Sequence, residues 1–224
     1  MDLLIIYLLM LIIPAIASYN IKKNYSIYKG IRNNRGITGF EVARKILDAN
    51  ELNNVYIVEN PNGELSDCYD SSRKTVKLSP DVFNGETVAA LAIAAHECGH
   101  AIQDKEGYSF LKIRHTLIPL VKFSSIAGYI AIMISILAGI LNLLWIGIAL
   151  ECVILFFQLI TLPVEFNASN RALKQIEKLG IVEKDEKEGC KKMLTSAALT
   201  YVASVLSAVM QIVRLVLMGN SRRR

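Results

Sequence analysis

The stretch His96-Glu97-Cys98-Gly99-His100 stands inside an apolar run whose spacing predicts a helix over residues 86–105. The two histidines are four residues apart, so they lie roughly 40° apart around the helix axis and both imidazoles can reach one metal ion. Glu97 lies about 100° further round, which suits a group that takes a proton from a metal-bound water better than it suits a ligand. The apolar run is too short to span a bilayer, so we expect a buried core helix.

Hydrophobic residues make up 53% of the 224 residues, yet the charged residues gather in a few segments. That segregation is typical of a multi-pass membrane protein. The net charge of +5 does not indicate nucleic-acid binding, because the basic residues flank apolar segments and are interleaved with acids elsewhere. The four cysteines form no C-x-x-C pair and are expected to be reduced.

The apolar segments set the expected architecture. Three of them predict transmembrane helices, over residues 3–19, 117–141 and 143–162. A fourth apolar helix, residues 196–218, is expected either to span or to be partly buried in the protein. The stretches that are polar enough to fold in water are residues 20–116 and 163–194.

Short patterns within the first polar stretch predict a small β-sheet. Val55–Val58 reads as a strand, and Leu65–Tyr69 with Thr75–Leu78 reads as a hairpin. The sequence therefore predicts one domain over residues 1–224, an α+β integral membrane protein that is mostly helical. It would have three to four transmembrane helices and a small zincin-like catalytic part with a short sheet.

A catalytic zinc needs a third protein ligand and one open position for water. His115 is one candidate, although its place beside Arg114 at the start of a span is common for an interfacial histidine. Glu165 is the better candidate: a lone glutamate just past a span is usually only an interfacial charge, but its neighbourhood, Leu162–Ser169, favours a ligand here.

Eight segments together resemble the YugP-like neutral zinc metallopeptidases of bacterial membranes. They are Thr38-Gly39, Glu41–Asp48, Leu65–Asp67, Val76–Pro80, Ala94–Gln103, Arg114–Leu117, Leu162–Phe166 and Ala197–Val202. The resemblance covers nearly the whole chain and is far more specific than the five-residue motif. It implies one Zn²⁺ per chain, held by His96, His100 and Glu165, with Glu97 as catalytic acid/base. It also implies a multi-pass protein of the bacterial cell membrane.

Two positions depart from the pattern of the relatives. Cys68 stands where they have histidine, and Asn167 stands where they often have aspartate. More distant His-Glu-x-x-His enzymes carry an aspartate four residues after the glutamate ligand, where this chain has Ser169. The partners of the ligand imidazoles therefore stay open among Asn167, Asn170 and Asp67.

A donor to the developing oxyanion is also expected, and Tyr201 or His115 could supply it. The simpler interpretation of Tyr201 is an interfacial aromatic residue. Substrate is expected to add as an extended strand to the short sheet, on Leu65–Tyr69 or Thr75–Leu78.

The spans carry polar residues of their own. Glu151, Gln158 and Glu165 recur every seven residues, and the last apolar segment has a polar stripe. The stripe comprises Ser196, Thr200, Ser204, Ser207, Gln211 and Arg214. Either these faces line a polar cavity that extends into the bilayer, or they satisfy each other within a helix bundle.

Basic residues after the first predicted span and before the second place the catalytic part in the cytoplasm and the N-terminus outside. Arg222–Arg224 would then also lie outside if the last helix crosses fully, which disagrees with the rule.

The predicted function is that of a membrane-anchored zinc endopeptidase. Its expected partners are protein or peptide substrates, membrane proteins among them, and the lipid bilayer; no nucleic acid is expected, and the oligomeric state stays open. A non-enzymatic scaffold or adaptor with structural zinc is the alternative, against which an intact Glu97 argues. A metal transporter would place its site on the spans, unlike this motif.

Overall fold

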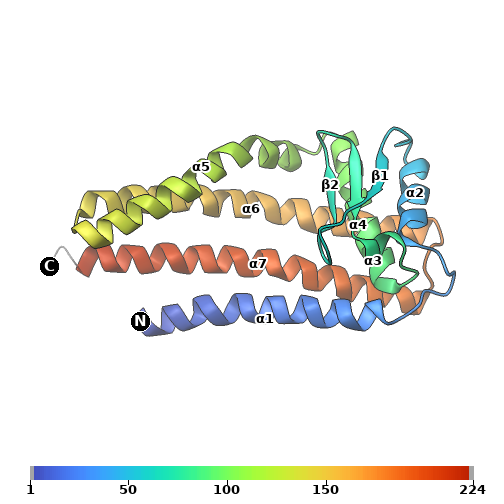
Figure 1. Cartoon of the computed structure of the whole chain (residues 1–224), viewed down its shortest axis with the longest axis horizontal. Helices are drawn as coiled ribbons and strands as arrows, with labels where there is room; N and C mark the ends of the chain where they lie inside the picture. Colours follow the sequence, from blue (N-terminus) through green and yellow to red (C-terminus); the bar gives the residue numbers. More distant parts are fainter. Residues whose placement is uncertain (1–2, 222–224) are drawn as a thin grey trace. The chain divides into compact units, whose positions relative to one another are not determined.

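The computed structural model describes residues 3–221, with side chains from residue 4 onward (Figure 1). The described part contains seven α-helices and one three-stranded sheet. In chain order the elements are α1 (Leu3–Lys29), α2 (Gly39–Ala49), β1 (Tyr56–Glu59), β2 (Cys68–Asp70), β3 (Thr75–Leu78), α3 (Pro80–Phe83), α4 (Val88–Lys105), α5 (Ser109–Ala138), α6 (Leu141–Lys178) and α7 (Lys184–Ser221).

The chain forms two compact units, which are described separately. The helical unit comprises Met1–Ser18, Lys112–Pro163 and Leu199–Arg224. The sheet unit comprises Tyr19–Leu111 and Val164–Ala198. The protein is thus mostly helical with one small sheet, as the composition and the strand patterns predict.

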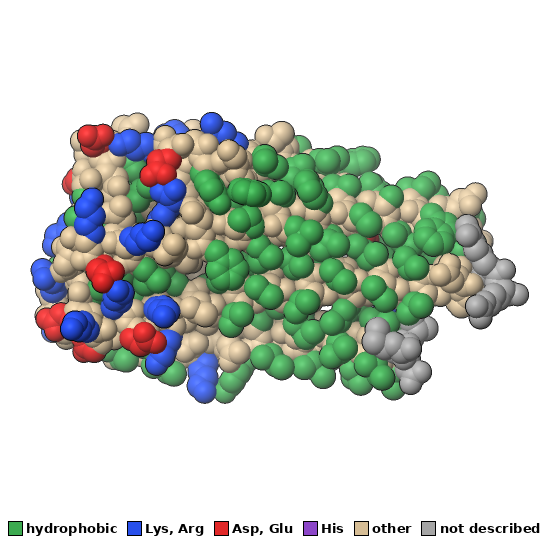
Figure 2. Space-filling model, turned by 180° about the vertical axis from the view of Figure 1, so that it is seen from behind, with side chains coloured by type: hydrophobic (Ala, Val, Ile, Leu, Met, Phe, Trp, Pro, Cys, Tyr) green, Lys and Arg blue, Asp and Glu red, His purple; other side chains and the backbone are tan. Residues whose placement is uncertain are grey.

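Four helices, α1, α5, α6 and α7, are long and apolar enough to cross a membrane. The fourth apolar segment is therefore also a candidate span by length and composition. The described residues contain four candidate spans, the upper end of the expected three to four. Figure 2 shows hydrophobic side chains over the long helices, whereas Lys, Arg, Asp and Glu gather over the sheet unit. A surface so divided by polarity suits a chain that meets both lipid and water.

The candidate spans do not end where their apolar runs end. Helix α6 continues through Pro163 as far as Lys178, so the expected division between a span ending at residue 162 and a separate polar segment is not a break in the helix. In contrast, α5 ends at Ala138, before the predicted Leu141, because Gly139 adopts a left-handed φ of +69°.

Close contacts between helices tie the helical unit together. A Cβ placed on Gly147 of α6 would lie 2.5 Å from Ile132 Cγ1 of α5, so only glycine allows this approach. Leu144 and Ile148 of α6 share a buried cluster with Ile132 and with Leu215 of α7. These contacts fix α5, α6 and α7 as neighbours inside this unit.

The sheet unit has β3 at the centre of its sheet, in the order β1-β3-β2. β3 runs parallel to β1 and antiparallel to β2, with Val76 opposite Tyr69. The predicted hairpin is confirmed by β2 and β3, although its first strand begins at Cys68 rather than Leu65 and ends at Asp70 rather than Tyr69. Helix α4 packs against α2 and against this sheet and is buried along nearly its whole length. The expected core helix is therefore present, beginning at Val88 rather than at residue 86.

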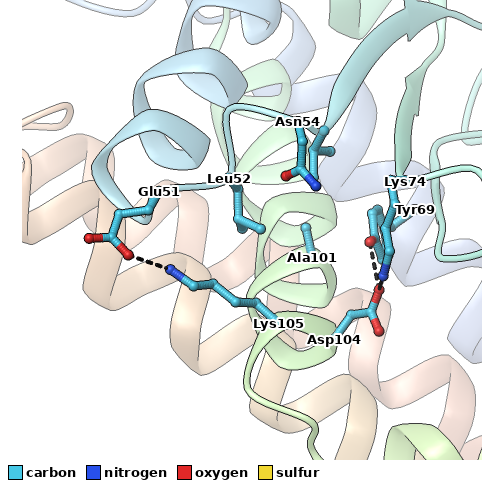
Figure 3. A pocket seen from close by; sticks show the side chains of 9 residues that line it. Glu51, Leu52, Asn54, Tyr69, Lys74, Ala101, Asp104 and Lys105 are labelled. Atoms are coloured by element: carbon cyan, nitrogen blue, oxygen red, sulfur yellow. Dashed lines mark hydrogen bonds and ion pairs between the residues drawn. The ribbon is translucent and has the colours of Figure 1, made fainter.

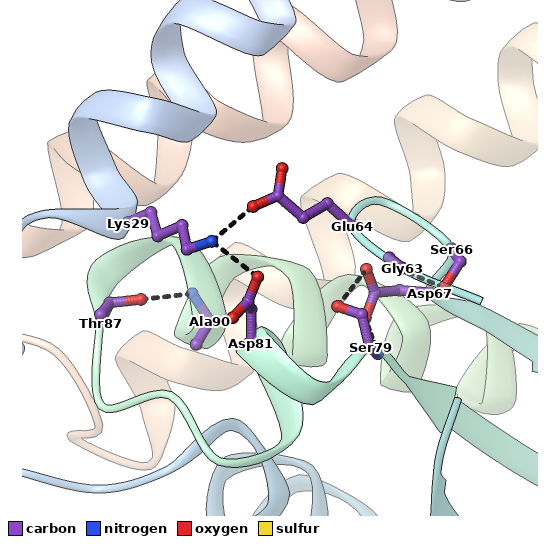
Figure 4. Close-up of polar contacts among 9 residues, drawn as sticks. All are labelled: Lys29, Gly63, Glu64, Ser66, Asp67, Ser79, Asp81, Thr87 and Ala90. Carbon is purple, nitrogen blue, oxygen red and sulfur yellow. Dashed lines mark hydrogen bonds and ion pairs between the residues drawn. The ribbon is translucent and has the colours of Figure 1, made fainter. Parts of the chain in front are cut away.

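Local caps start the helices of the sheet unit. Thr38 and Glu41 form a capping box at the start of α2, with Glu41 N–H donating to Thr38 Oγ1 at 3.2 Å. Thr87 caps α4 by accepting a hydrogen bond from Ala90 N–H. Ser79 precedes Pro80 at the start of α3, but its hydroxyl donates to Asp67 instead of capping the helix (Figure 4).

Lys29 ties the end of α1 to the rest of the sheet unit. Its ammonium donates to Glu64, in the loop before β2, and to Asp81 of α3 (Figure 4). Both carboxylates are largely exposed, so this pair of ion pairs contributes modestly to stability and serves mainly to orient the loop.

Candidate metal centre

Helices α4 and α6 bring His96, His100 and Glu165 together inside the sheet unit. Glu165 Oε2 lies 3.3 Å from His96 Nε2 and 3.6 Å from His100 Nε2. The exposed fractions of the three side chains are only 14%, 11% and 3%, respectively. The two imidazole rings meet edge to face, with centroids 4.8 Å apart. The sequence spacing put the two histidines on one helix face, and the fold adds the carboxylate from 65 residues further along the chain.

Gly99 allows the two helices to approach this closely. A Cβ at this position would lie 2.5 Å from the carbonyl oxygen of Ala168 in α6. Backbone oxygens cannot give way as a flexible side chain can, so any other residue would force the helices apart. Gly99 therefore sets the distance between the helix that carries the imidazoles and the helix that carries Glu165.

The distances from the carboxylate oxygen to the two imidazole nitrogens fit a tetrahedral zinc ion. With Zn–N and Zn–O bonds of about 2.1 Å, two ligands of such an ion lie about 3.4 Å apart. The measured separations of 3.3 and 3.6 Å match this value, and one atom from each of the three residues lies within 4.8 Å of the others. Two neutral nitrogens and one carboxylate oxygen are also a donor set that zinc uses in catalytic sites.

The hydrogen bonds around Gln103 determine the tautomer of His100. The Gln103 amide nitrogen donates to the Val164 carbonyl at 2.8 Å and to Asn167 Oδ1 at 2.9 Å. Because a carbonyl can only accept, the amide oxygen must be the atom that lies 3.0 Å from His100 Nδ1. Nδ1 therefore carries the proton and donates it, which leaves the Nε2 lone pair directed at Glu165 and available to a metal ion.

Ser169 is the partner of the other imidazole. Its hydroxyl lies 3.2 Å from His96 Nδ1 and can accept a hydrogen bond from the Nδ1–H group. The serine thus occupies the position where distant relatives carry aspartate, and it still reaches the imidazole. Its neutral hydroxyl makes a weaker hydrogen bond than a carboxylate would.

The predicted partners of the imidazoles have other positions. Asn167 acts through Gln103, and its Oδ1 also accepts from Arg171 Nε at 2.6 Å. Asp67 accepts from Ser79 N–H at 2.7 Å instead of reaching an imidazole. Gln103 and Ser169 were not predicted as partners. The spacing of three between His100 and Gln103 is the signal that indicates a contact on one helix face.

Glu97 is buried beside the three converging side chains, with 7% of its surface exposed. The backbone N–H of Tyr69 donates to its carboxylate. Burial raises the pKa of Glu97 to about 7; the neighbouring His96 opposes this shift and the Glu165 charge adds to it. A carboxyl group with a pKa near neutrality can both take and return a proton, as an acid/base catalyst must.

The hydrogen bond from Tyr69 places Glu97 at the outer edge of β2. Since β2 is an edge strand, its backbone groups that point away from β3 and are not bonded to Glu97 can pair with another chain. The expectation that Thr75–Leu78 could also receive a substrate strand is wrong, because β3 has a partner on each side. Only the β2 candidate of the predicted pair keeps a free edge.

A pocket of about 260 Å³ lies further along α4, and the Tyr69 side chain is part of its lining (Figure 3). Its lining includes Leu52, Val55 and Ala101, and its rim charges are paired with each other. The pairs are Glu51 with Lys105 and Lys74 with Asp104, and the Tyr69 hydroxyl donates to Asp104 at 2.7 Å. The backbone of Tyr69 therefore contacts Glu97, and its ring lines this pocket.

The two proposed oxyanion donors lie on the helices of the helical unit. His115 is part of α5 and Tyr201 is part of α7. Their role stays a prediction.

Comparisons with known proteins show the family to which the chain is similar. A family profile described as "Putative neutral zinc metallopeptidase" matches residues 3–220. The chain is 43% identical over 201 residues to a Bacillus subtilis (strain 168) protein named "Putative membrane protease YugP", covering 90% of this chain and 89% of that protein. No solved structure matches the chain.

Proposed function

Since the chain belongs to this family of neutral zinc metallopeptidases, we propose that it is a membrane-anchored zinc endopeptidase in which Glu97 is the catalytic acid/base. His96, His100 and Glu165 would hold one zinc ion per chain. The proposal is supported by the convergence of two imidazole nitrogens on one carboxylate oxygen, with His96 Nε2 and His100 Nε2 lying 3.3 and 3.6 Å from Glu165 Oε2 beside a buried carboxyl group.

Zinc bound there would supply Lewis acidity, which polarises the scissile carbonyl and lowers the pKa of the attacking water. Glu97 accepts the proton of that water as it attacks, and then donates it to the leaving amine. The Tyr69 N–H holds the Glu97 carboxylate in place during both transfers. A structural zinc site has no use for such a base, which favours the enzyme over the scaffold.

The free edge of β2 supports an extended polypeptide as substrate. A chain that pairs with β2 is held by backbone hydrogen bonds, which do not depend on sequence. Its carbonyls lie along the edge to which Tyr69 brings Glu97. We therefore propose that specificity is broad and that the substrate must be unfolded at the cleavage point.

We also propose that the sheet unit faces the cytoplasm of the bacterial cell. Lys22, Lys23 and Lys29 follow the apolar part of α1, and Lys112 and Arg114 precede that of α5. Basic residues next to spans remain on the cytoplasmic side. Arg222–Arg224, which would disagree with this rule, lie outside the described residues.

The replacement Glu97→Gln tests the enzymatic role. The purified full-length variant should keep one zinc per chain and cleave an unstructured reporter protein about 10²–10⁴ times more slowly than the wild type, the range expected for a lost general base. Glu188→Gln is the matched control, because Glu188 is exposed and belongs to the same unit. Its rate should equal that of the wild type.

Two results would reject the proposal. Cleavage that persists in Glu97→Gln at the wild-type rate removes Glu97 from the chemistry. A wild-type protein that holds zinc firmly and cleaves no reporter, with or without a membrane anchor, indicates the structural-zinc scaffold instead.

A further inference from the structure

Polar side chains of α6 and α7 meet inside the helical unit, where the surrounding residues are apolar. The contacts of Leu144 with Gly219 and of Ile148 with Leu215 fix the antiparallel register of the two helices. One turn beyond Ile148 comes Glu151, which lies within electrostatic range of Arg214 of α7. The two charged residues therefore face each other within this unit.

The same register places a second polar layer next to the first. Seven residues further along α6 is Gln158, and seven residues back along α7 is Ser207. A step of seven residues keeps a side chain on nearly the same face and moves it about 10 Å along the helix. We call the four residues Glu151, Gln158, Ser207 and Arg214 the polar seam.

The polar seam lies at the depth of the membrane interior. Glu151 is about 15 Å along the helix axis from the first residue of α6, roughly half the thickness of a hydrocarbon core. Charged groups at that depth are costly and persist where they have a partner or a function. If Glu151 and Arg214 formed a tight ion pair, each charge would have its partner and no further function would be needed.

The residues of the polar seam do not satisfy each other. Gln158 Oε1, Ser207 Oγ and Arg214 Nε are buried and have no hydrogen-bond partner among the described residues. The guanidinium of Arg214 lies over the ring of Tyr7, 5.0 Å from its centre, instead of forming an ion pair with Glu151 in the described part of the chain. Of the two readings offered by the sequence, mutual satisfaction within the bundle is thus the weaker.

The unpartnered groups of the seam are of both hydrogen-bonding types. Gln158 Oε1 and the Glu151 carboxylate accept, Arg214 Nε donates, and the Ser207 hydroxyl does either. A peptide group likewise presents one donor and one acceptor. In a membrane, such a group can leave helical structure only where protein satisfies it.

We infer that the polar seam binds an unwound segment of a membrane-inserted substrate polypeptide. This inference rests on the proposed function, because an edge strand can receive only a chain that has left its helix. The seam would stabilise the backbone of that segment while it is still in the membrane. It thereby adds membrane proteins with locally unwound spans to the substrate class.

The double variant Gln158→Leu/Ser207→Ala tests the inference. Both replacements remove buried, unpartnered polar groups from apolar surroundings, so they should leave the fold intact or stabilise it. The assay compares one cleavable unstructured sequence in two forms, soluble or fused to a transmembrane segment, in the same detergent. We expect kcat/KM to fall about tenfold for the membrane-anchored form and to stay within about twofold for the soluble form.

Ser204→Ala is the matched control, because the Ser204 hydroxyl already donates to the Thr200 carbonyl of its own helix at 2.9 Å. It should change neither rate. Equal losses for both reporters in the double variant would assign the seam a structural role, and unchanged rates for both would remove it from substrate binding.

A binding measurement separates this inference from the proposed function. In the Glu97→Gln background, a photo-crosslinker at Gln211, on the same stripe of α7, should capture the anchored reporter without turnover. The double variant should reduce this capture several-fold. If the double variant captures as much anchored reporter as the parent, the seam does not bind substrate, even if the enzyme cleaves. If the double variant captures less, the binding role of the seam is supported, even if no cleavage is found.

Discussion

At the residue scale, small and uncharged side chains make the candidate metal centre possible. Gly99 lets α4 approach α6, and Gln103 fixes the tautomer of His100 through three hydrogen bonds. The ligands themselves follow from the His-Glu-x-x-His spacing and from the resemblance around Glu165. The supporting residues do not, because their partners come from a helix more than 60 residues away in the chain.

Replacing Gly99 by alanine should separate the two helices. The added Cβ would lie 2.5 Å from the Ala168 carbonyl oxygen, which cannot move without shifting α6. We expect a destabilisation of about 1–3 kcal/mol, as for other overpacked cores, and a lower affinity for zinc. Thermal unfolding and zinc titration measure the two effects.

Gly30→Ala is the control for this change, since a Cβ at Gly30 would meet its nearest neighbour at an ordinary 3.4 Å. If the Gly99→Ala variant unfolded at the same temperature and bound zinc with the same affinity as the Gly30→Ala variant, the close approach of α4 and α6 would be wrong.

Gln103→Leu should weaken zinc binding while preserving packing volume. The variant loses the acceptor for His100 Nδ1–H and leaves the Val164 carbonyl without its donor. Loss of such an outer partner typically costs 10–100-fold in metal affinity. Competition with a chelator measures the change, and Gln175→Leu, which removes an amide bonded only to Asn50, should leave the affinity unchanged.

At the element scale, the structure differs from the sequence expectation where a pattern is ambiguous or a contact is distant. Helix α6 continues through Pro163, although a proline removes one backbone hydrogen bond, because the residues on both sides are packed in buried surroundings. The hairpin follows from alternation and turn residues. The parallel pairing of β1 with β3 does not, since it joins strands separated by β2 in the chain.

The β2–β3 hairpin has an acid-sensitive contact at Asp70. Hydrogen bonds from the Ser72 hydroxyl and from Lys77 hold the pKa of Asp70 well below its usual range. Its ionised form therefore stabilises the folded state above the unfolded pKa of about 3.9, and the contribution is lost as the pH falls through the lower folded value.

Asp70→Asn should accordingly lower the melting temperature by a constant amount between pH 7 and pH 5, and by less below pH 4. Asp48→Asn, at a similar but more exposed ion pair of α2, serves as the control. A difference between wild type and Asp70→Asn that grows on acidification would have the wrong sign for this contact.

At the scale of the whole molecule, composition and hydropathy predict a membrane protein with a polar catalytic part. The fourth candidate span could be identified only from the structure. In the sequence, its polar stripe left open whether this segment spans the membrane, whereas α7 is long and apolar enough to cross. The sequence could not reveal the polar seam, because an unpaired buried atom is a property of the packed helices rather than of either helix.

Labelling from each side of the membrane tests the proposed orientation. With the exposed Cys68 and Cys152 replaced by serine, single cysteines at Lys45 and Glu188 should react only when a thiol reagent reaches the cytoplasm. A cysteine at Ile140, between α5 and α6, should react from outside intact cells. The reverse pattern would place the sheet unit outside.

Zinc-edge X-ray absorption of the purified full-length protein tests the metal centre most directly. We expect one zinc per chain with two imidazole nitrogens and carboxylate oxygen at about 2.0–2.2 Å, and loss of the carboxylate ligand and of tight binding in Glu165→Ala. A sulfur neighbour at about 2.3 Å, or a zinc environment that Glu165→Ala leaves unchanged, would contradict it.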